Sequence, residues 1–186
     1  MKRNALSLAL VAGLSLGAAA PASASFIGYY GVSNWTTTLN NGGTVNTSGA
    51  PGQIAVTSGN SFGDNFGGPA GDTDFTIAAQ AAGLVSFNWS FTTNDLDASF
   101  DPFGYLLNGV FTQLTNNALS GQSGIASFAV TSGDIFGFRA HTEDNGWGAG
   151  TGTVSNFNAP ASSVPEPGTL ALLVLGGALA ARRRKV

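Results

Sequence analysis

Apolar and polar residues alternate without a break between residues 85 and 92. Val85, Phe87, Trp89 and Phe91 fall on one side, while serine, asparagine and threonine fall on the other. A period of two over four repeats predicts an antiparallel strand with one face in a core and one face in solvent.

Weaker alternation of the same kind recurs further along the chain. In 135–143, Phe136 and Phe138 would face inward, so Arg139 and His141 share the opposite face. Further strands are predicted at 26–32, 34–39, 53–57, 75–77, 104–107, 110–114, 126–130 and 152–157.

Turn residues separate these strands, and the pair Asn108-Gly109 predicts a two-residue hairpin. No part of residues 25–158 has apolar residues at helical spacing. About nine or ten short strands predict an all-β fold, a single antiparallel β-sandwich of jelly-roll type. We expect this domain at 25–158, followed by a linker at 159–164.

The N-terminal segment 1–24 has the pattern of a secretory signal peptide. Two basic residues precede an apolar stretch at 5–20, and Ala22 and Ala24 form a small-residue cleavage site. The mature protein is therefore expected to begin at Ser25, although a retained membrane helix is an alternative.

The C-terminal segment 165–186 mirrors this pattern. Its apolar stretch, 168–181, has 14 residues, whereas a stable membrane span needs about 20. The basic residues after it would stay in the cytoplasm, which leaves the domain outside. The apolar stretch would then serve as a transient anchor or, alternatively, as a plain C-terminal membrane anchor. The motif consists of Pro165, Glu166 and Pro167, the apolar stretch, and then Arg182, Arg183 and Arg184.

These three parts, in this order at the chain end, resemble the PEP-CTERM sorting signal, a tail also known as an ice-binding protein C-terminal domain. The resemblance implies a Gram-negative bacterium and an exosortase-type enzyme that processes the tail. It also implies transient anchoring in the inner membrane by a short transmembrane helix. The cell surface or the extracellular matrix, with its exopolysaccharide and biofilm, would be the destination.

The body carries a fainter resemblance. Residues 100–109 and 134–139 are similar to segments of small exported PEP-CTERM proteins and, more distantly, to a CUB-like sandwich. CUB domains usually carry disulfides, which are absent here, so that relation is an analogy of fold.

Composition removes several classes of function. The 186 residues include no cysteine and one histidine, which excludes disulfides, thiolate zinc sites and a cysteine nucleophile. Between the two terminal segments, Arg139 is the one basic residue against nine acidic residues, a net charge of −8. Such a surface repels phosphate, so nucleic acid is not an expected partner.

Aspartates at alternate positions are the main chemical resource of the body. Asp95, Asp97 and Asp101 resemble the start of a calcium loop, although Phe100 stands where an EF-hand requires glycine. We therefore predict a looser structural Ca²⁺ site, to which Asp134, or Glu143 and Asp144, would also contribute. No other cofactor is expected. The alternative is that these acids only solvate loops.

Trp147 is the best candidate for ligand binding, because it lies between glycines in a predicted loop and could stack on a sugar ring. Packing in the core is its alternative role. No residue is assigned as catalytic. His141 could serve a Ser-His-Asp site, but no Gly-x-Ser-x-Gly elbow accompanies it.

Together these features predict an exported, non-enzymatic binding or structural module that contacts extracellular polysaccharide. A polysaccharide-active enzyme using acidic loop residues is an alternative. A weaker alternative, prompted by the tail and by Thr36-Thr37-Thr38, is an ice- or surface-binding protein.

Overall fold

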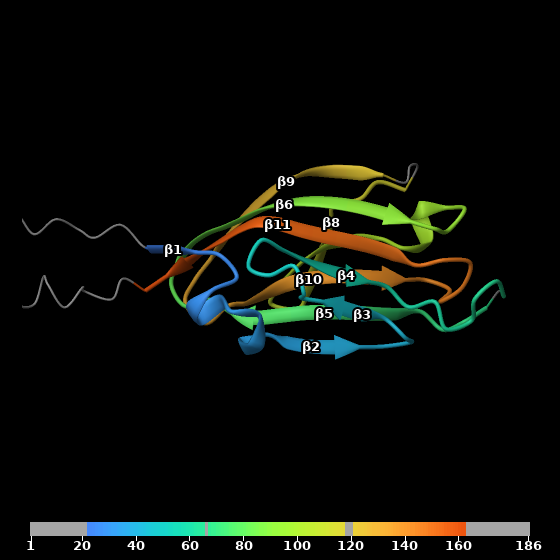
Figure 1. The fold of residues 1–186 in the computed structure, drawn as a ribbon, viewed down its shortest axis with the longest axis horizontal. Helices are drawn as coiled ribbons and strands as arrows, with labels where there is room; N and C mark the ends of the chain where they lie inside the picture. Colours follow the sequence, from blue (N-terminus) through green and yellow to red (C-terminus); the bar gives the residue numbers. More distant parts are fainter. Residues whose placement is uncertain (1–21, 66, 118–120, 163–186) are drawn as a thin grey trace, which may run out of the picture.

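The computed structural model describes residues 22–65, 67–117 and 121–162, and their strands form two antiparallel sheets packed face to face (Figure 1). The first sheet has the order β3-β4-β11-β6-β9, with β1 also paired to β11; the second has the order β2-β5-β10-β7-β8. The first sheet contains β1 (Ala22–Ala24), β3 (Thr44–Asn46), β4 (Gln53–Thr57), β6 (Gly83–Thr93), β9 (Gln122–Val130) and β11 (Gly150–Ala161). The second contains β2 (Thr36–Leu39), β5 (Gly71–Ala78), β7 (Phe103–Leu107), β8 (Val110–Gln113) and β10 (Ile135–Thr142).

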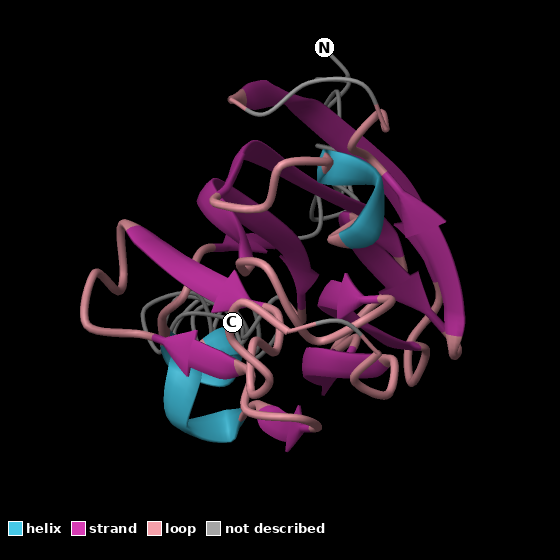
Figure 2. Ribbon diagram, turned by 90° about the vertical axis from the view of Figure 1, so that its right-hand side faces the viewer, coloured by secondary structure: helices cyan, strands magenta, loops and turns pink. Residues whose placement is uncertain are grey.

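The strands from β4 to β11 are connected as a jelly roll. Numbered one to eight along the chain, they lie in the order 1-8-3-6 in the first sheet and 2-7-4-5 in the second. Except for β7 and β8, which form a hairpin in the second sheet, successive strands thus cross between the layers, as in two interlocked Greek keys. The predicted all-β antiparallel sandwich is confirmed. Figure 2 shows that helix is limited to a few short segments of the described chain.

The strand with the clearest alternation in sequence lies near the centre of the first sheet. In β6, Val85, Phe87, Trp89 and Phe91 are all buried, as predicted, and the residues between them are not. Their side chains enter the interface between the sheets because successive strand residues point to opposite faces.

The predicted hairpin is also confirmed. Leu107 pairs with Val110 across the turn, and Asn108 and Gly109 have φ angles of 50° and 81°. Two consecutive left-handed residues define a type I′ turn, which matches the twist of the flanking strands.

Aromatic rings fill much of the interior. Trp35 stacks on the paired residues Phe75, at a centroid distance of 4.7 Å, and Phe138, at 5.7 Å. Trp35 is 7% exposed, so this ring is part of the core and not a ligand platform. Stacked rings at these distances contribute beyond the area that they bury.

Two expectations are wrong at the ends of the domain. Residues 26–32, predicted as a strand, contain the 3₁₀ segment η1 (Gly28–Tyr30), and a second segment, η2 (Val32–Asn34), follows at once. These tight turns bring Tyr30 into the core, where its hydroxyl donates to the Pro160 carbonyl at 2.7 Å. The predicted start of the linker, residue 159, is too early, because β11 continues to Ala161.

Two three-residue strands escaped the sequence pattern. β3 pairs with β4, and β1 pairs with the end of β11, where Ala22 lies opposite Ala161. Three residues are too few to show a period of two.

Candidate functional site

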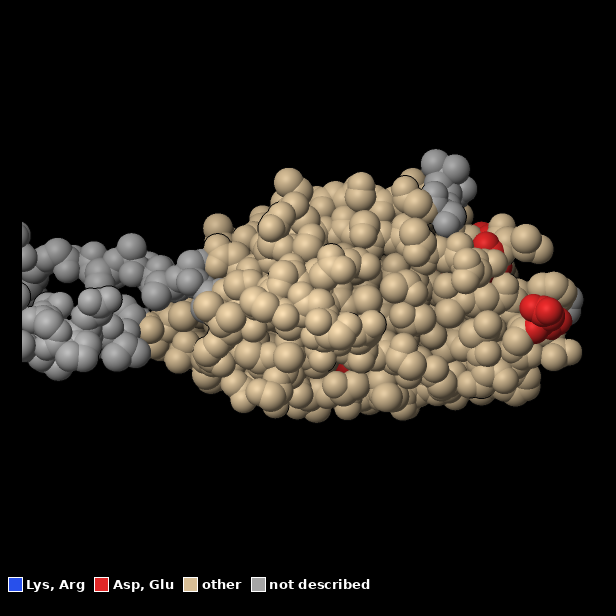
Figure 3. Space-filling view, viewed as in Figure 1, with Lys and Arg blue, Asp and Glu red and all other residues tan. Residues whose placement is uncertain are grey.

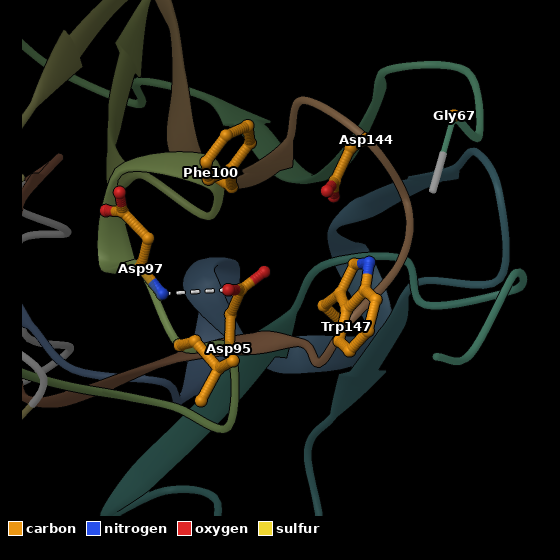
Figure 4. Close-up of a pocket in the computed structure, with 7 residues that line it drawn as sticks. Gly67, Asp95, Asp97, Phe100, Asp144 and Trp147 are labelled. Atoms are coloured by element: carbon orange, nitrogen blue, oxygen red, sulfur yellow. Dashed lines mark hydrogen bonds between the residues drawn. The ribbon is translucent and has the colours of Figure 1, made fainter. Parts of the chain in front are cut away.

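A cavity of about 340 Å³ lies among the loops at one end of the sandwich (Figure 4). These loops join β4 to β5, β6 to β7 and β10 to β11, and they meet at the end opposite to residues 22 and 162 (Figure 1). The lining residues are Gly67, Asp95, Leu96, Asp97, Phe100, Asp144 and Trp147. The structure therefore brings Trp147 together with Asp95 and Asp97, two of the three aspartates predicted to bind Ca²⁺.

Side chains cap the backbone along the β6–β7 loop. The Asp95 amide donates to Thr93 Oγ1, the Asp97 amide to Asp95 Oδ1 and the Ser99 amide to Asp97 Oδ1, each at 2.9 Å. An acceptor two residues before each amide makes a run of Asx- and Thr-type turns. The Ser99 backbone N–H also lowers the pKa of Asp97 below its usual value. The alternate spacing that suggested calcium thus serves the fold of the loop.

Asp101 points away from the cavity into the protein. It is 1% exposed and accepts hydrogen bonds from Ser58 Oγ at 2.9 Å and from Thr93 Oγ1 at 3.0 Å. Burial raises its pKa to about 6. Because Ser58 Oγ also accepts from the Gly150 amide, this carboxyl group ties together the ends of β4, β6 and β11.

The calcium hypothesis stays a prediction. Within residues 22–65, 67–117 and 121–162 no group of three histidine, aspartate or glutamate side chains is arranged to hold a metal ion. A Ca²⁺ ion bound by Asp95, Asp97 and Asp101 would require Asp101 to leave Ser58 and Thr93. An unfolding midpoint that does not differ between excess EDTA and excess CaCl₂ would contradict the hypothesis.

The β10–β11 loop holds Trp147 in an unusual backbone conformation. Asn145 and Trp147 have φ angles of 52° and 59°, in the left-handed region that a bulky residue rarely adopts. The loop is kept in place because the Asn145 side chain accepts from the Ser61 amide at 2.8 Å and the Trp147 amide donates to the Gly63 carbonyl. Strain held in this way is characteristic of functional sites.

Gly148 allows this loop to reach the β6–β7 loop. Its φ is 146°, and a Cβ atom there would meet the backbone of Asp95. Only a glycine permits so close an approach, and the result is that Trp147 and Asp95 line one cavity.

The cavity combines an apolar lining with carboxylates. Phe100 is 40% exposed and Leu96 is 91% exposed, and both border the space beside Trp147. Asp95 Oδ2 is buried with no hydrogen-bond partner, and Figure 4 shows it directed toward the space between Asp144 and Trp147. Aromatic rings suit the C–H faces of a sugar, and carboxylates accept from its hydroxyl or ammonium groups.

Three lining residues, Gly67, Leu96 and Phe100, were not predicted from the sequence, whereas Asp144 is one of the predicted additional ligands. A single exposed apolar residue in a loop has no distinctive pattern. Leu96 and Phe100 lie near Trp147 because two loops about 50 residues apart in sequence meet in the folded chain.

The histidine belongs to a different cluster, on the outer face of β5 and β10. His141 Nδ1 lies 2.7 Å from Asp72, and Nε2 lies 3.4 Å from Glu143. Arg139 makes a bidentate pair with Asp74 at 2.7 Å and also contacts Asp72 at 3.0 Å. Since both ring nitrogens of His141 face carboxylates, the ring is not placed to activate a serine hydroxyl.

Most of the predicted targeting residues lie outside the described part of the chain. This applies to 1–21, to Pro165, Glu166 and Pro167, to the apolar stretch 168–181 and to Arg182, Arg183 and Arg184. Ala22 and Ala24, the predicted cleavage site, lie in β1, and cleavage there stays a prediction. Across the described residues, no helix has the length and hydropathy needed to cross a bilayer.

A comparison with protein families decides the nature of the tail. Residues 163–185 match the PEP-CTERM protein-sorting motif. The tail is a PEP-CTERM signal. This confirms the resemblance found in the sequence, and a PEP-CTERM signal indicates an exported protein with a transient membrane anchor. No curated protein sequence matched the chain.

Solved structures with a similar outline include carbohydrate-binding modules. A family 35 module from Clostridium thermocellum is 13% identical, with a TM-score of 0.37 over 73% of this chain and 98% of that one. A family 35 module from an environmental isolate is 14% identical, with a TM-score of 0.34 over 54% of this chain and 77% of that one. The Podospora anserina GH26-CBM35 β-(1,4)-mannanase is 15% identical, with a TM-score of 0.34 over 78% of this chain and 29% of that one. At these TM-scores the likenesses carry no argument about this chain's ligand.

Proposed function

We propose that this protein is an exported carbohydrate-binding module, delivered by an exosortase-type system to the cell surface or the extracellular matrix. The observation that supports binding is the cavity in which Trp147 and Phe100 lie beside the carboxylates of Asp95 and Asp144. Its volume, about 340 Å³, is within the range of small-ligand sites. Polysaccharide of the matrix is the proposed partner.

The position of the cavity supports this proposal. The PEP-CTERM motif begins at residue 163, directly after the described chain, and the loops that line the cavity lie at the far end of the sandwich (Figure 1). During transient anchoring through the tail, the cavity would face away from the membrane. A polymer outside the cell could then reach it.

The arrangement of acids favours binding over hydrolysis. A glycosidase needs a carboxylic acid with a raised pKa beside its substrate, opposite a second, ionised carboxylate. The described carboxyl group with a raised pKa is that of Asp101, and it faces Ser58 and Thr93 in the interior. We therefore propose a non-enzymatic role, and release of reducing ends from a bound polysaccharide would contradict it.

A substitution of the ring tests the binding site. Trp147→Ala should weaken binding to the saccharide that the full chain binds, about tenfold or more, because the stacking surface is lost. Isothermal titration calorimetry against neutral, acidic and amino-sugar oligosaccharides measures the effect.

Tyr29→Ala is the matched control, since Tyr29 is a 41% exposed aromatic residue near the opposite end. Trp147→Phe keeps an aromatic ring and should retain part of the affinity. This variant distinguishes loss of the stacking surface from unfolding of the loop. Equal affinity of the parent chain and a folded Trp147→Ala variant would remove the proposed site.

A further inference from the structure

The charge of the cavity restricts which sugar it can hold. Three of its lining residues are aspartates, Asp95, Asp97 and Asp144. Figure 3 shows acidic side chains gathered at this end of the molecule, while the broad face in view is almost free of charge.

No described cation balances these carboxylates. Arg139 is the one Lys or Arg of the described residues, and its guanidinium is paired with Asp72 and Asp74 on the second sheet. The cavity therefore has a negative field in which a uronic acid or a sulfated sugar would be repelled.

One carboxylate oxygen is left without a donor. Asp95 Oδ1 accepts from the Asp97 amide, but Asp95 Oδ2 is buried with no hydrogen-bond partner. In Figure 4 this second oxygen points toward the space between Asp144 and Trp147. A buried carboxyl oxygen without a hydrogen bond is unfavourable until a donor reaches it, and a charged N–H group is the strongest donor for such an oxygen.

The aromatic side of the cavity suits the same group. Trp147 offers an indole ring, the aromatic system that attracts cations most strongly. A ring and a carboxylate on one cavity wall together favour an ammonium group over a hydroxyl, because both attract positive charge.

We propose that the sugar bound in this cavity carries a free amine, as in a glucosamine polymer whose units are not acetylated. The inference rests on the proposed carbohydrate-binding function and narrows its ligand class. The ammonium group would lie between Asp95 and Asp144, with the sugar ring against Trp147.

The test compares three oligosaccharides of equal length with the full chain: glucosamine, N-acetylglucosamine and glucose oligomers. We expect the glucosamine oligomer to bind at least tenfold more tightly than the other two at pH 6 and low salt. The preference should shrink as ionic strength rises, because charges near the surface are screened.

Two variants remove charge with little change of shape. Asp95→Asn keeps the oxygen that accepts from Asp97, and Asp144→Asn keeps the oxygen that accepts from the Gly146 amide at 3.2 Å. Each should lower the preference for the amine severalfold while binding of the glucose oligomer changes little. Asp64→Asn, an equal change of charge at an exposed loop residue outside the cavity lining, is the control.

The outcomes separate the two proposals. Trp147-dependent binding without preference for the amine overturns this inference and leaves the carbohydrate-binding function standing. Binding of none of these or other saccharides overturns both. An equal loss in Asp64→Asn, or loss of binding in EDTA, also overturns the inference, since it would indicate general charge attraction or a bridging metal ion.

Discussion

Asp101 is the residue whose chemistry departs most from its usual behaviour. It is almost completely buried, and its pKa is raised to about 6 from an ordinary value of 3.8. In the folded protein it therefore holds its proton more tightly than in the unfolded chain. The sign of the effect on stability follows from that difference: as pH rises from about 4 to 6, this group lowers the free energy of unfolding.

The pH prediction is made with Asp101→Asn, which resembles the protonated acid. A shift of about two pKa units corresponds to up to about 3 kcal/mol. Relative to the parent, we expect the variant to become more stable by about 1–3 kcal/mol between pH 4 and pH 7. Denaturant unfolding at each pH measures it. Parallel stability curves for the parent and Asp101→Asn would contradict the prediction, and Asp64→Asn serves as the exposed control.

At the scale of elements, a glycine of β11 allows close packing of this strand against β7 in the opposite sheet. Gly152 of β11 lies against the ring of Phe103 of β7, and a Cβ atom at position 152 would overlap that ring. Phe103 is fully buried, so the ring has little room to move. A side chain at 152 would force the layers apart.

Gly152→Ala should therefore destabilise the protein by about 1–3 kcal/mol, the usual range for overpacking a core. Thermal or chemical unfolding measures the change. Gly52→Ala is the matched control, because a Cβ atom there meets only the Gly49 carbonyl at an ordinary 3.4 Å. If both variants unfold at the same midpoint as the parent, the account of this contact is wrong.

At the scale of the whole molecule, folding and delivery use separate parts of the chain. The described residues form a continuous hydrophobic core, whereas the sorting motif spans 163–185. The predicted signal peptide, 1–24, includes all of β1, which among the described strands pairs with the last three residues of β11. Tyr30 holds that end of β11 independently of β1, through its bond to Pro160 and the bond that it accepts from the Gln80 amide at 2.9 Å.

Deletion of residues 163–186 should change where the protein goes and leave its fold intact. We expect an unfolding midpoint within about 2 °C of that of the longer chain, and loss of retention at the membrane or the surface. Calorimetry and cell fractionation provide the two measurements. A markedly lower midpoint would show that the tail contributes to the fold.

Mass spectrometry of the exported protein tests the other end. An N-terminus at Ser25 is expected. Tyr30→Phe should then destabilise the processed protein by about 1–3 kcal/mol, because the buried Pro160 carbonyl and the partly buried Gln80 amide both lose their partner. An N-terminus before Ala22 would contradict cleavage at this site.

Much of the fold could be read from the chain because the relevant information is local. Alternation in β6 placed its four apolar side chains in the core, and Asn108-Gly109 defined its turn. Where the information is not local, the predictions were wrong or absent. Residues 28–34 form 3₁₀ turns because Tyr30 reaches across to β11, and β3 is a strand because β4 lies beside it.

The sequence by itself determined the class of fold, the acidic character of the body and the sorting signal at its end, since each is written in a continuous run of residues or in composition. Only the tertiary structure decided which loop residues share a cavity. Trp147 and Asp95 meet because the jelly-roll order brings the β6–β7 and β10–β11 loops to one end of the sandwich. The same folding turned Asp101 inward, since a side chain's direction depends on partners, here Ser58 and Thr93, that the folded chain brings beside it.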